Sequence, residues 1–232
     1  MAHYLVISAS STIGQCVVQK LRAQGHTVFT TARNDNKIVP DAILDASNFE
    51  EVSNVFGKAG AIDGVVNCSG SLLLKPAHLT KEEEYHDVIN SSLTTAFATV
   101  RAAGKTMTKG GSVVLISSSA ALLGIPNHEA IAAAKAGING LVLSAAATYA
   151  PMNLRFNAVA PGLVKTALTS SITDNDLSLR LSEAMHPLGR IGSPEEIARA
   201  IIFLLDPKNS WITGQIIAVD GGLSTIKQKV RI

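Results

Sequence analysis

The chain has 232 residues, of which 47% are hydrophobic and 16% are charged, a balance that excludes an intrinsically disordered protein. Its 20 basic and 18 acidic residues give a net charge of +2 without a basic block, so we expect neither a nucleic-acid partner nor a membrane partner. Two cysteines are too few for a disulfide framework, and the N-terminus begins with an apolar run rather than a charged leader. The sequence therefore predicts a cytoplasmic globular protein.

Short runs rich in Val and Ile alternate with helix-length segments along the chain. The predicted strands are residues 4–8, 27–31, 42–45, 64–67, 112–117, 155–160 and 216–220. Residues 13–25 predict a helix that ends at a glycine, and residues 193–205 predict a helix that Ser193 caps and Pro194 begins. This alternation predicts an α/β fold in three α/β/α layers. We expect a Rossmann-like, doubly wound parallel sheet of about seven strands, in a single domain over residues 1–232.

The turn after the first predicted strand is a candidate ligand site, because ligands bind at the carboxyl ends of the strands in such a sheet. The turn reads SASSTIG, where a dinucleotide site favours glycines that let the backbone approach a pyrophosphate. Only Gly14 is a glycine, and the hydroxyl groups of Ser8 and Thr12 can donate to phosphate while their Cβ atoms crowd it. Alone, the turn fits a nucleotide site or a serine-rich helix cap. The candidate residues are Ser8, Ser10, Ser11, Thr12, Ile13 and Gly14.

Six further motifs follow along the chain: NCSG (67–70), ISSS (116–119), AAAKAG (132–137), RFNAVAPGLVKT (155–166), HPLGRIGSPEEIA (186–198) and ITGQIIAVDGG (212–222). In order and spacing they resemble the short-chain dehydrogenase/reductase family over essentially the whole chain. The resemblance implies a nicotinamide dinucleotide site that lies along the strand ends, with Asp45 at the adenine and Thr166 at the carboxamide. The implied cofactor-binding residues are Asp45, Ala46, Asn67, Ser69, Gly70, Lys135, Pro161, Gly162, Val164 and Thr166.

The choice of cofactor depends on the end of the second predicted strand, where Ala32 is followed by Arg33. A carboxylate at this place would accept a hydrogen bond from a ribose 2′-hydroxyl group and repel a 2′-phosphate. A guanidinium group is instead a planar donor fork suited to phosphate. We therefore predict NADP(H) rather than NAD(H), with Arg33 at the 2′-phosphate. The alternative interpretation is an ordinary surface arginine.

The resemblance also implies a catalytic serine, tyrosine and lysine, together with an asparagine from the long central helix. Ser118 and Lys135 match the serine and the lysine, whereas Ile131 stands at the tyrosine and Ser92 at the asparagine. Because isoleucine has no proton to donate, the family's usual alcohol–ketone mechanism cannot run unaided.

Two interpretations of this difference remain open. His128 lies seven residues before Lys135, and residues 125–136 resemble the matching stretch of bacterial enoyl-acyl-carrier-protein reductases, whose catalytic tyrosine has that spacing. The first interpretation is an oxidoreductase that reduces a small carbonyl or enoyl substrate, with His128 as an atypical proton donor. The second is a non-catalytic relative that binds a nucleotide or a partner, in which His128 is a capping or surface residue.

Three further expectations concern partners and specificity. Helices predicted over residues 127–150 and 81–108 correspond, by the same resemblance, to a contact between subunits, so we expect a homodimer or homotetramer. The polar segment 163–190 predicts a mobile lid over the substrate pocket, and it leaves the identity of the substrate open. The six histidines show no metal-ligand spacing, and no metal site is predicted.

Overall fold

The centre of the computed structural model is a sheet of seven parallel strands in the order β3-β2-β1-β4-β5-β6-β7. The strands are β1 (His3–Ile7), β2 (Thr27–Ala32), β3 (Ala42–Ile43), β4 (Gly64–Asn67), β5 (Gly111–Ile116), β6 (Leu154–Pro161) and β7 (Ile216–Val219). The structure describes residues 1–227, and residues 228–232, the end of the predicted domain, lie outside the described residues. The predicted Rossmann-like parallel sheet is confirmed.

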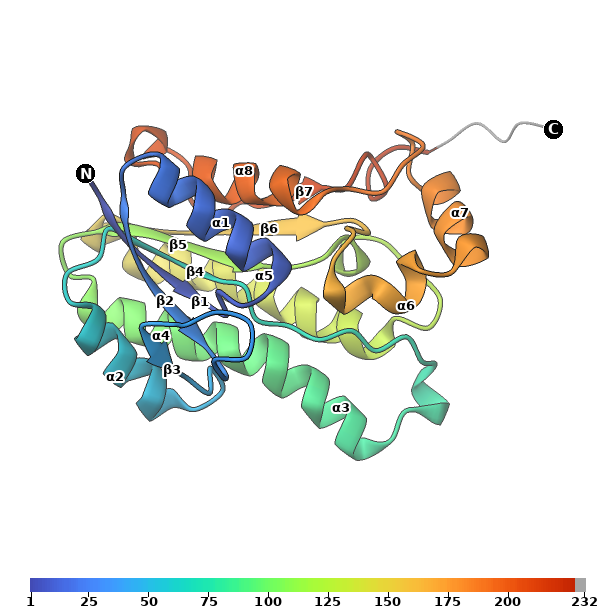
Figure 1. Cartoon of the computed structure of the whole chain (residues 1–232), viewed down its shortest axis with the longest axis horizontal. Coiled ribbons are helices and arrows are strands. Elements are labelled where there is room, and N and C mark those ends of the chain that lie inside the picture. The colour runs from blue at the N-terminus through green and yellow to red at the C-terminus, as the bar shows by residue number, and fades with distance from the viewer. Residues whose placement is uncertain (228–232) are drawn as a thin grey trace.

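Helices cover both faces of the sheet and give the three layers seen in Figure 1. The helices are α1 (Thr12–Ala23), α2 (Phe49–Ala59), α3 (Glu82–Ile89), α4 (Thr95–Thr106), α5 (Glu129–Tyr149), α6 (Ser170–Thr173), α7 (Asp176–Met185) and α8 (Pro194–Leu205). Helices α1 and α8 pack together on one face, whereas α2, α4 and α5 cover the other. Helices α6 and α7 lie beyond the carboxyl ends of the strands (Figure 1).

Local sequence explains where the predicted helices begin and end. Before α8, the Ser193 hydroxyl group accepts a hydrogen bond from the Glu196 N–H (3.3 Å), and the Glu196 carboxylate accepts one from the Ser193 N–H (2.9 Å). This capping box, followed by Pro194, fixes the first turn of the helix. Helix α1 ends shortly before Gly25, whose φ of 81° is a conformation that favours glycine.

Three predicted segments are corrected by the structure. The predicted strand over 42–45 is only the two residues of β3: the Leu44 N–H still donates to the Ala32 carbonyl oxygen of β2 at 2.9 Å, and the chain then turns at residues 46–47. The helix predicted from residue 127 begins at Glu129, because Asn127 has a φ of 63°, a left-handed conformation that asparagine tolerates but that no α-helix contains.

The third correction concerns the helix predicted over 81–108, which a π-helical turn at Asn90–Thr94 divides into α3 and α4. Hydroxyl groups in and directly after this turn donate to backbone carbonyl oxygens three or four residues earlier, from Ser91 to Asp87 at 2.7 Å and from Thr95 to Ser92 at 2.9 Å. Such back-bonding loosens the regular helical ladder, and π-helical turns are frequent at functional sites.

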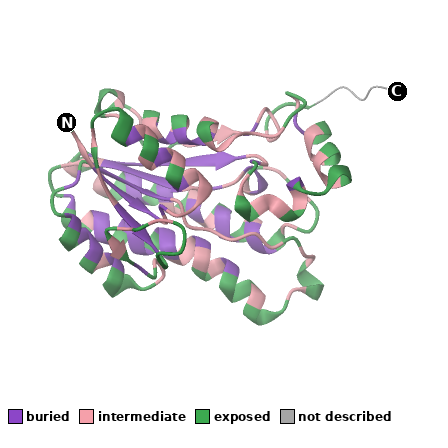
Figure 2. Cartoon of the chain, viewed as in Figure 1, coloured by how far each residue is buried: buried purple, intermediate pink, exposed green. Residues whose placement is uncertain are grey.

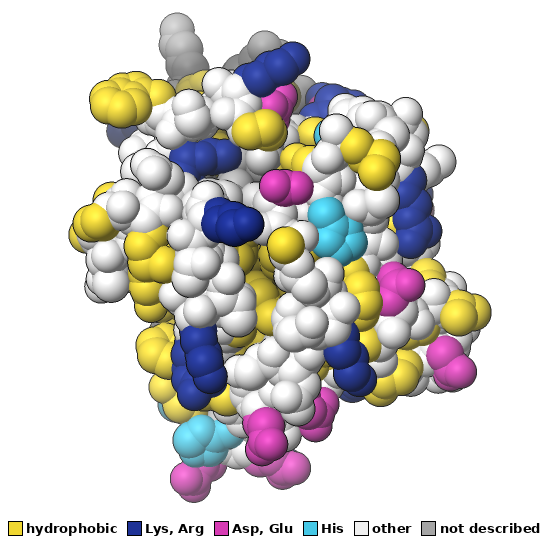
Figure 3. Space-filling model, turned by 90° about the vertical axis from the view of Figure 1, so that its left-hand side faces the viewer, with side chains coloured by type: hydrophobic (Ala, Val, Ile, Leu, Met, Phe, Trp, Pro, Cys, Tyr) yellow, Lys and Arg dark blue, Asp and Glu magenta, His cyan; other side chains and the backbone are white. Residues whose placement is uncertain are grey.

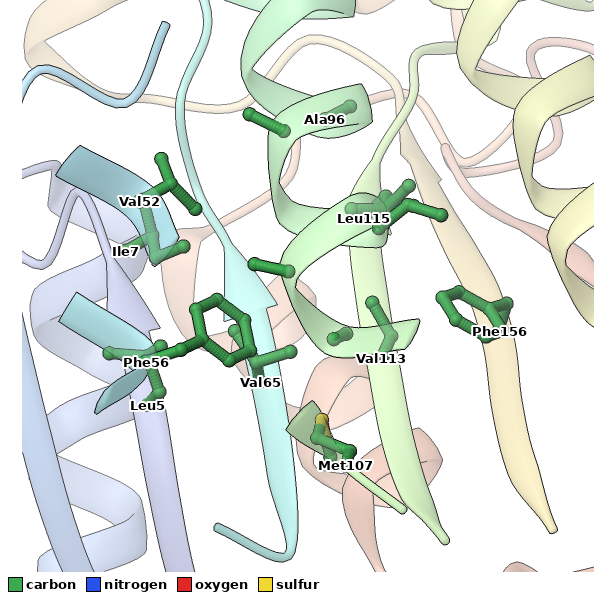
Figure 4. Packing of buried hydrophobic residues seen from close by; sticks show 14 of the residues in the cluster. Leu5, Ile7, Val52, Phe56, Val65, Ala96, Met107, Val113, Leu115 and Phe156 are labelled. Atoms are coloured by element: carbon green, nitrogen blue, oxygen red, sulfur yellow. The ribbon is translucent and has the colours of Figure 1, made fainter. Parts of the chain in front are cut away.

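Two hydrophobic clusters hold the helices against the sheet. In the cluster of Figure 4, Leu5 of β1 and Val65 of β4 meet Phe56 of α2. On the opposite face, Val17 of α1 and Ile201 of α8 pack against the strands. All five side chains are at most 2% exposed. Figure 2 shows the same division, with buried strands at the centre and exposed residues on the outer sides of the helices.

The surface carries charges of both signs, as the composition predicts. On the face drawn in Figure 3, Lys and Arg side chains are interspersed with Asp and Glu side chains. The segment Glu129–Met152 is, by length and composition, the one membrane-span candidate among the residues that the structure describes, and 44% of its most apolar window is buried. Its helix α5 packs against β5, β6 and α4, which is the position of a core helix.

Candidate active site

A cavity of about 760 Å³ opens at the carboxyl ends of β1, β4, β5 and β6. The strand order reverses between β1 and β4, and this switch point is where doubly wound sheets bind ligands. The structure brings twelve of the predicted site residues together around this cavity: Ser11, Thr12, Ile13, Ser69, Gly70, Ser118, His128, Lys135, Pro161, Gly162, Val164 and Thr166.

Asn67 does not line the cavity but supports its wall from behind. Its buried side-chain amide donates to the Thr95 carbonyl oxygen (3.0 Å) and to the Thr99 hydroxyl group (2.9 Å). Its side-chain oxygen accepts from the backbone N–H of Ser69 (2.8 Å). With every polar atom engaged, Asn67 joins β4 to α4 and sets the backbone direction at Ser69 and Gly70.

Three residues of the first turn also shape the cavity without lining it. Ser8 adopts a φ of 59°, and its hydroxyl group bonds to that of Ser69 at 2.6 Å, so it is not directed at a phosphate. The carbonyl oxygen of Ser10 accepts from the Gln15 amide at 3.1 Å. A Cβ atom on Gly14 would lie 2.6 Å from the Ser8 carbonyl oxygen. Gly14 therefore allows α1 to approach the turn closely.

Arg33, Asp45 and Ala46 lie outside the cavity, beyond the ends of β2 and β3. The Asp45 carboxylate accepts from the Ser47 hydroxyl group (2.7 Å) and backbone N–H (3.0 Å), and these bonds lower the pKa of Asp45. The positive charge of exposed Arg33 lowers it further. Ala46 packs against the core. In the same region Lys37, which was not among the predicted residues, does line the cavity.

The start of α1 presents free backbone donors to the cavity. The Ser11 hydroxyl group caps the helix by accepting from the Gly14 N–H at 3.1 Å. Within the described part of the chain, the N–H groups of Thr12 and Ile13 have no hydrogen-bond partner. Two unpaired donors at the positive end of a helix of 12 residues form an arrangement that binds anions.

Lys135 of α5 is the buried cation of the site. It is 5% exposed, and its ammonium group donates to the carbonyl oxygen of Ile116, at the end of β5, over 2.8 Å. Burial lowers the pKa of Lys135 to about 8. A Cβ atom on Gly70 would lie 3.2 Å from its Nζ atom, so the glycine leaves room in front of the ammonium group. Burial raises the pKa of the nearby Cys68 thiol to about 12, which keeps it protonated.

Ser118 follows β5 and faces the same cavity. Its hydroxyl oxygen accepts from the backbone N–H of Ala120 at 3.1 Å, which leaves the hydroxyl hydrogen available to a ligand. The neighbouring Ser117 donates to the Asn139 side-chain oxygen at 2.6 Å and thereby ties the end of β5 to α5. Ser118 and Lys135 are thus held by the same pair of elements.

His128 and Ile131 line the cavity on the N-terminal side of Lys135. The Nδ1 atom of His128 lies 2.8 Å from the Pro126 carbonyl oxygen, which can only accept, so Nδ1 carries the hydrogen. The Nε2 atom then carries a hydrogen only in the imidazolium form. His128 occupies the N-cap position of α5 without capping it through its side chain. Ile131 is 4% exposed and packs with Val88.

Ser92 lies in the π-helical turn and is 1% exposed. Among the described residues its hydroxyl group has no hydrogen-bond partner, although such groups are normally paired when buried. A Cβ atom on Gly70 would lie 3.9 Å from this hydroxyl oxygen and 3.2 Å from the Lys135 Nζ atom. Ser92 and Lys135 therefore approach the same side of Gly70.

The sequence and the fold both match known proteins. A family described as Enoyl-(Acyl carrier protein) reductase matches residues 7–224. The chain is 34% identical to 3-oxoacyl-acyl-carrier-protein reductase FabG of Thermotoga maritima, over 94% of this chain and 96% of the relative. The chain belongs to the short-chain dehydrogenase/reductase family.

Solved structures agree with this assignment. The aldohexose dehydrogenase of Thermoplasma acidophilum has a TM-score of 0.90 with this chain at 27% identity, covering 100% of this chain and 97% of the other. ElxO, solved with NADP bound, has a TM-score of 0.88 at 27% identity, covering 96% of this chain and 99% of the other. The chain is thus similar in fold to these enzymes over nearly its whole length.

A nicotinamide dinucleotide, the group that this family implies, fits the residues present. The free N–H groups of Thr12 and Ile13 suit a pyrophosphate, and Gly70 keeps the space in front of Lys135 clear. Thr166 also lines the cavity and is the first residue of a short loop. In this loop the Ala167 N–H donates to the Thr12 hydroxyl group at 3.4 Å.

Sequence reasoning missed the role of His186 in this short-chain dehydrogenase/reductase. His186 is 3% exposed, its Nδ1–H donates to the Ser182 carbonyl oxygen (2.6 Å), and its Nε2 atom accepts from the Leu163 N–H (3.2 Å). It joins the end of α7 to the end of β6 beside the cavity. The HPLGR motif contained this histidine, but no local pattern identifies a partner 23 residues away.

Proposed function

We propose that the chain is an NADP(H)-dependent reductase of a small carbonyl or enoyl compound. One arrangement supports this most strongly: Lys135 and Ser118 face the same cavity as the free N–H groups of Thr12 and Ile13. An anion-binding helix start, a buried ammonium group and a free hydroxyl donor together suit a dinucleotide and a polar substrate oxygen.

In this proposal, the chain holds the cofactor along the strand ends. The N–H groups of Thr12 and Ile13 bind the pyrophosphate, Lys135 the nicotinamide ribose and Thr166 the carboxamide, while Arg33 binds the 2′-phosphate. When bound, the nicotinamide ring supplies the hydride. Since Lys135 has a pKa of about 8, it is charged at neutral pH and can donate to a ribose hydroxyl group.

For a carbonyl substrate, two side chains act on the oxygen. The Ser118 hydroxyl group donates to the substrate oxygen, which polarises the C=O bond. As the carbonyl carbon gains the hydride, the C=O π bond breaks and the oxygen takes a proton. We assign that proton to His128, which can release it from Nε2 only in the imidazolium form, because Nδ1–H is held by Pro126.

A non-catalytic nucleotide-binding protein is the second candidate, and Ile131 is the observation that favours it. One helical turn before Lys135 the cavity wall is an isoleucine, packed among Val88, Ala130 and Ala134. No group in that cluster can exchange a proton. If His128 does not replace the missing acid, the cavity binds a dinucleotide without turnover.

The wider proposal includes a lid, a subunit contact and a cellular location. Residues 163–190, which contain α6 and α7, form the lid, and the hydrogen bond that the Leu163 N–H donates to His186 Nε2 joins the first residue of this segment to a residue near its end. Large apolar side chains on the outer surfaces of α4 and α5, Phe97 (48% exposed) and Leu143 (56% exposed), support pairing of these helices in a homodimer or homotetramer. The proposed location is the cytoplasm.

Titration with NADPH, followed by its fluorescence, tests the proposal. We expect saturable binding that Lys135→Met weakens by at least about tenfold, since a charge-assisted hydrogen bond is lost. Lys105→Met, at an exposed lysine of α4, is the matched control and should bind like the parent. Turnover is then measured on carbonyl and enoyl compounds. Binding without turnover would favour the non-catalytic protein, and absence of binding would overturn both.

A further inference from the structure

One part of the cavity, called its apolar end below, is lined by aliphatic side chains. They come from separate segments: the loop after β4, the loop before α5, and the lid that contains α6 and α7. Six of them define this apolar end: Leu72, Leu74, Ile125, Leu168, Leu181 and Met185. Ile131 continues the same wall toward Lys135, where it adds a branched apolar side chain in place of a polar group.

Several of these side chains are exposed although they converge on one cavity. Leu168 is 52% exposed, Leu181 is 60% exposed and Met185 is 48% exposed, all on the lid. Leu74, on the opposite side of the cavity, is 40% exposed. Large apolar side chains that surround a concave space are typical of a site that an apolar ligand covers. Covering them removes apolar surface from water on both partners.

The side chains of the cavity that can carry a charge lie outside the six residues of its apolar end, and they include His128, the proposed proton donor. Among the described residues that line the cavity, no Asp, Glu or Arg occurs, and the lysines are Lys37 and Lys135. Lys37 lies between β2 and β3, and Lys135 contacts the end of β5. His186 has both ring nitrogens engaged by backbone groups. A carboxylate at the apolar end would therefore lose its water without gaining a partner.

Two of the hydroxyl groups near the lid are already engaged by the protein itself. Ser182 donates to the Ser178 carbonyl oxygen at 2.8 Å, and the Thr169 hydroxyl group is shared between the Val164 and Thr166 carbonyl oxygens. A site built for a sugar needs a partner for each hydroxyl group, since unpaired polar groups oppose binding. The name of one structural neighbour, an aldohexose dehydrogenase, would suggest a sugar as substrate, and this cavity differs from that expectation.

We infer that the substrate is a neutral carbonyl compound whose reactive group lies at Ser118 and whose remainder is an aliphatic chain or ring that contacts Leu168, Leu181 and Met185. This inference rests on the proposed function for the position of the reactive carbonyl. The apolar end of the cavity itself belongs to the chain and does not depend on turnover.

Matched ligands test the inference: 2-octanone, and 7-oxooctanoate, which keeps the methyl ketone and the chain length but ends in a carboxylate. Each is titrated calorimetrically into the protein with saturating NADP⁺, which cannot reduce a ketone, and into the free protein. We expect 2-octanone to bind at least about tenfold more tightly than 7-oxooctanoate in both states, because the carboxylate has no cationic partner. Glucose should show no binding at the same concentrations.

Two variants of one helix localise the effect. Leu181→Asp places a carboxylate on the lid side of the cavity and should weaken 2-octanone binding by about tenfold, with NADPH affinity unchanged. Leu177→Asp is the matched control, since Leu177 is 68% exposed on the same helix but does not line the cavity. Equal binding of the two ligands, or equal losses in the two variants, would overturn the inference. Failure of the protein to bind NADPH or to turn over would overturn only the proposed function.

Discussion

Lys135 makes the stability of this protein depend on pH in a direction opposite to that of an ion-paired lysine, whose pKa is raised in the folded chain. Burial lowers the pKa of its ammonium group from 10.5 to about 8. Below pH 8 both folded and unfolded chains carry the proton, and the folded chain bears the cost of a buried charge. Between about pH 8 and 10.5 the unfolded chain binds more protons, so stability rises with pH. A difference of about 2.5 in pKa corresponds to about 3 kcal/mol.

The perturbation that isolates this effect is Lys135→Met, which keeps an unbranched side chain of similar length. Urea unfolding is measured at pH 7.5 and at pH 10 for the parent and the variant. We expect the parent to gain on the order of 2 kcal/mol relative to the variant over this interval. The variant is needed because Cys68, whose pKa is raised by burial, lowers stability over the same range in both proteins.

The exposed Lys105 supplies the control, since Lys105→Met should leave the pH dependence of the parent unchanged. Parallel pH dependences in the parent and Lys135→Met would show that Lys135 titrates in the folded protein as it does in water. The assignment of Lys135 as a desolvated ammonium group facing the cavity would then be wrong.

Three further changes test the cofactor turn, the cofactor choice and the missing acid. Gly14→Ala places a Cβ atom 2.6 Å from the Ser8 carbonyl oxygen and should lower the free energy of unfolding by about 1–3 kcal/mol. In the control Gly57→Ala, in α2, the new Cβ atom meets nothing within 4 Å and should not lower the free energy of unfolding. Equal effects of the two changes in urea unfolding would contradict the close packing of α1. Arg33→Ala should weaken NADPH binding by about 1–3 kcal/mol and leave NADH binding nearly unchanged in fluorescence titrations, and equal losses for both would remove Arg33 from the 2′-phosphate. Ile131→Tyr puts a phenol one helical turn before Lys135 and should raise the rate of ketone reduction by about 10²–10⁴-fold in steady-state assays. Circular dichroism checks that the variant is folded. No gain in a folded variant that binds NADPH would contradict the claim that the site is otherwise complete.

The strands were predictable because parallel strands in this fold are short, apolar and buried. The β4 run matches its prediction at both ends, and β1, β5 and β6 differ by one residue at each end. The edge strand β3 was predicted too long, because an apolar run beside a sheet edge need not pair beyond two residues. The π-helical turn at Asn90–Thr94 was missed, since hydroxyl back-bonding has no distinct sequence period.

The site was predictable where a motif follows a strand and unpredictable where distant segments meet. Ser118 and Lys135 lie within the motifs that predicted them, and both line the same cavity. Asn67 was predicted among the cofactor-binding residues, and its side chain is instead hydrogen-bonded within the protein, because buried amide groups are normally paired. The contacts of His186 and the aliphatic lid depend on the path of residues 163–190, which local pattern does not determine.

Oxidation of bound NADPH in a single turnover tests the central claim most directly. Protein saturated with NADPH is mixed with excess 2-octanone, and the nicotinamide absorbance is followed with time. The proposed reductase predicts loss of one NADPH per occupied site, abolished in Lys135→Met and slowed by about 10²-fold or more in His128→Ala. Stable absorbance with 2-octanone and with every carbonyl and enoyl compound of the panel, despite tight NADPH binding, would contradict a catalytic role for this cavity.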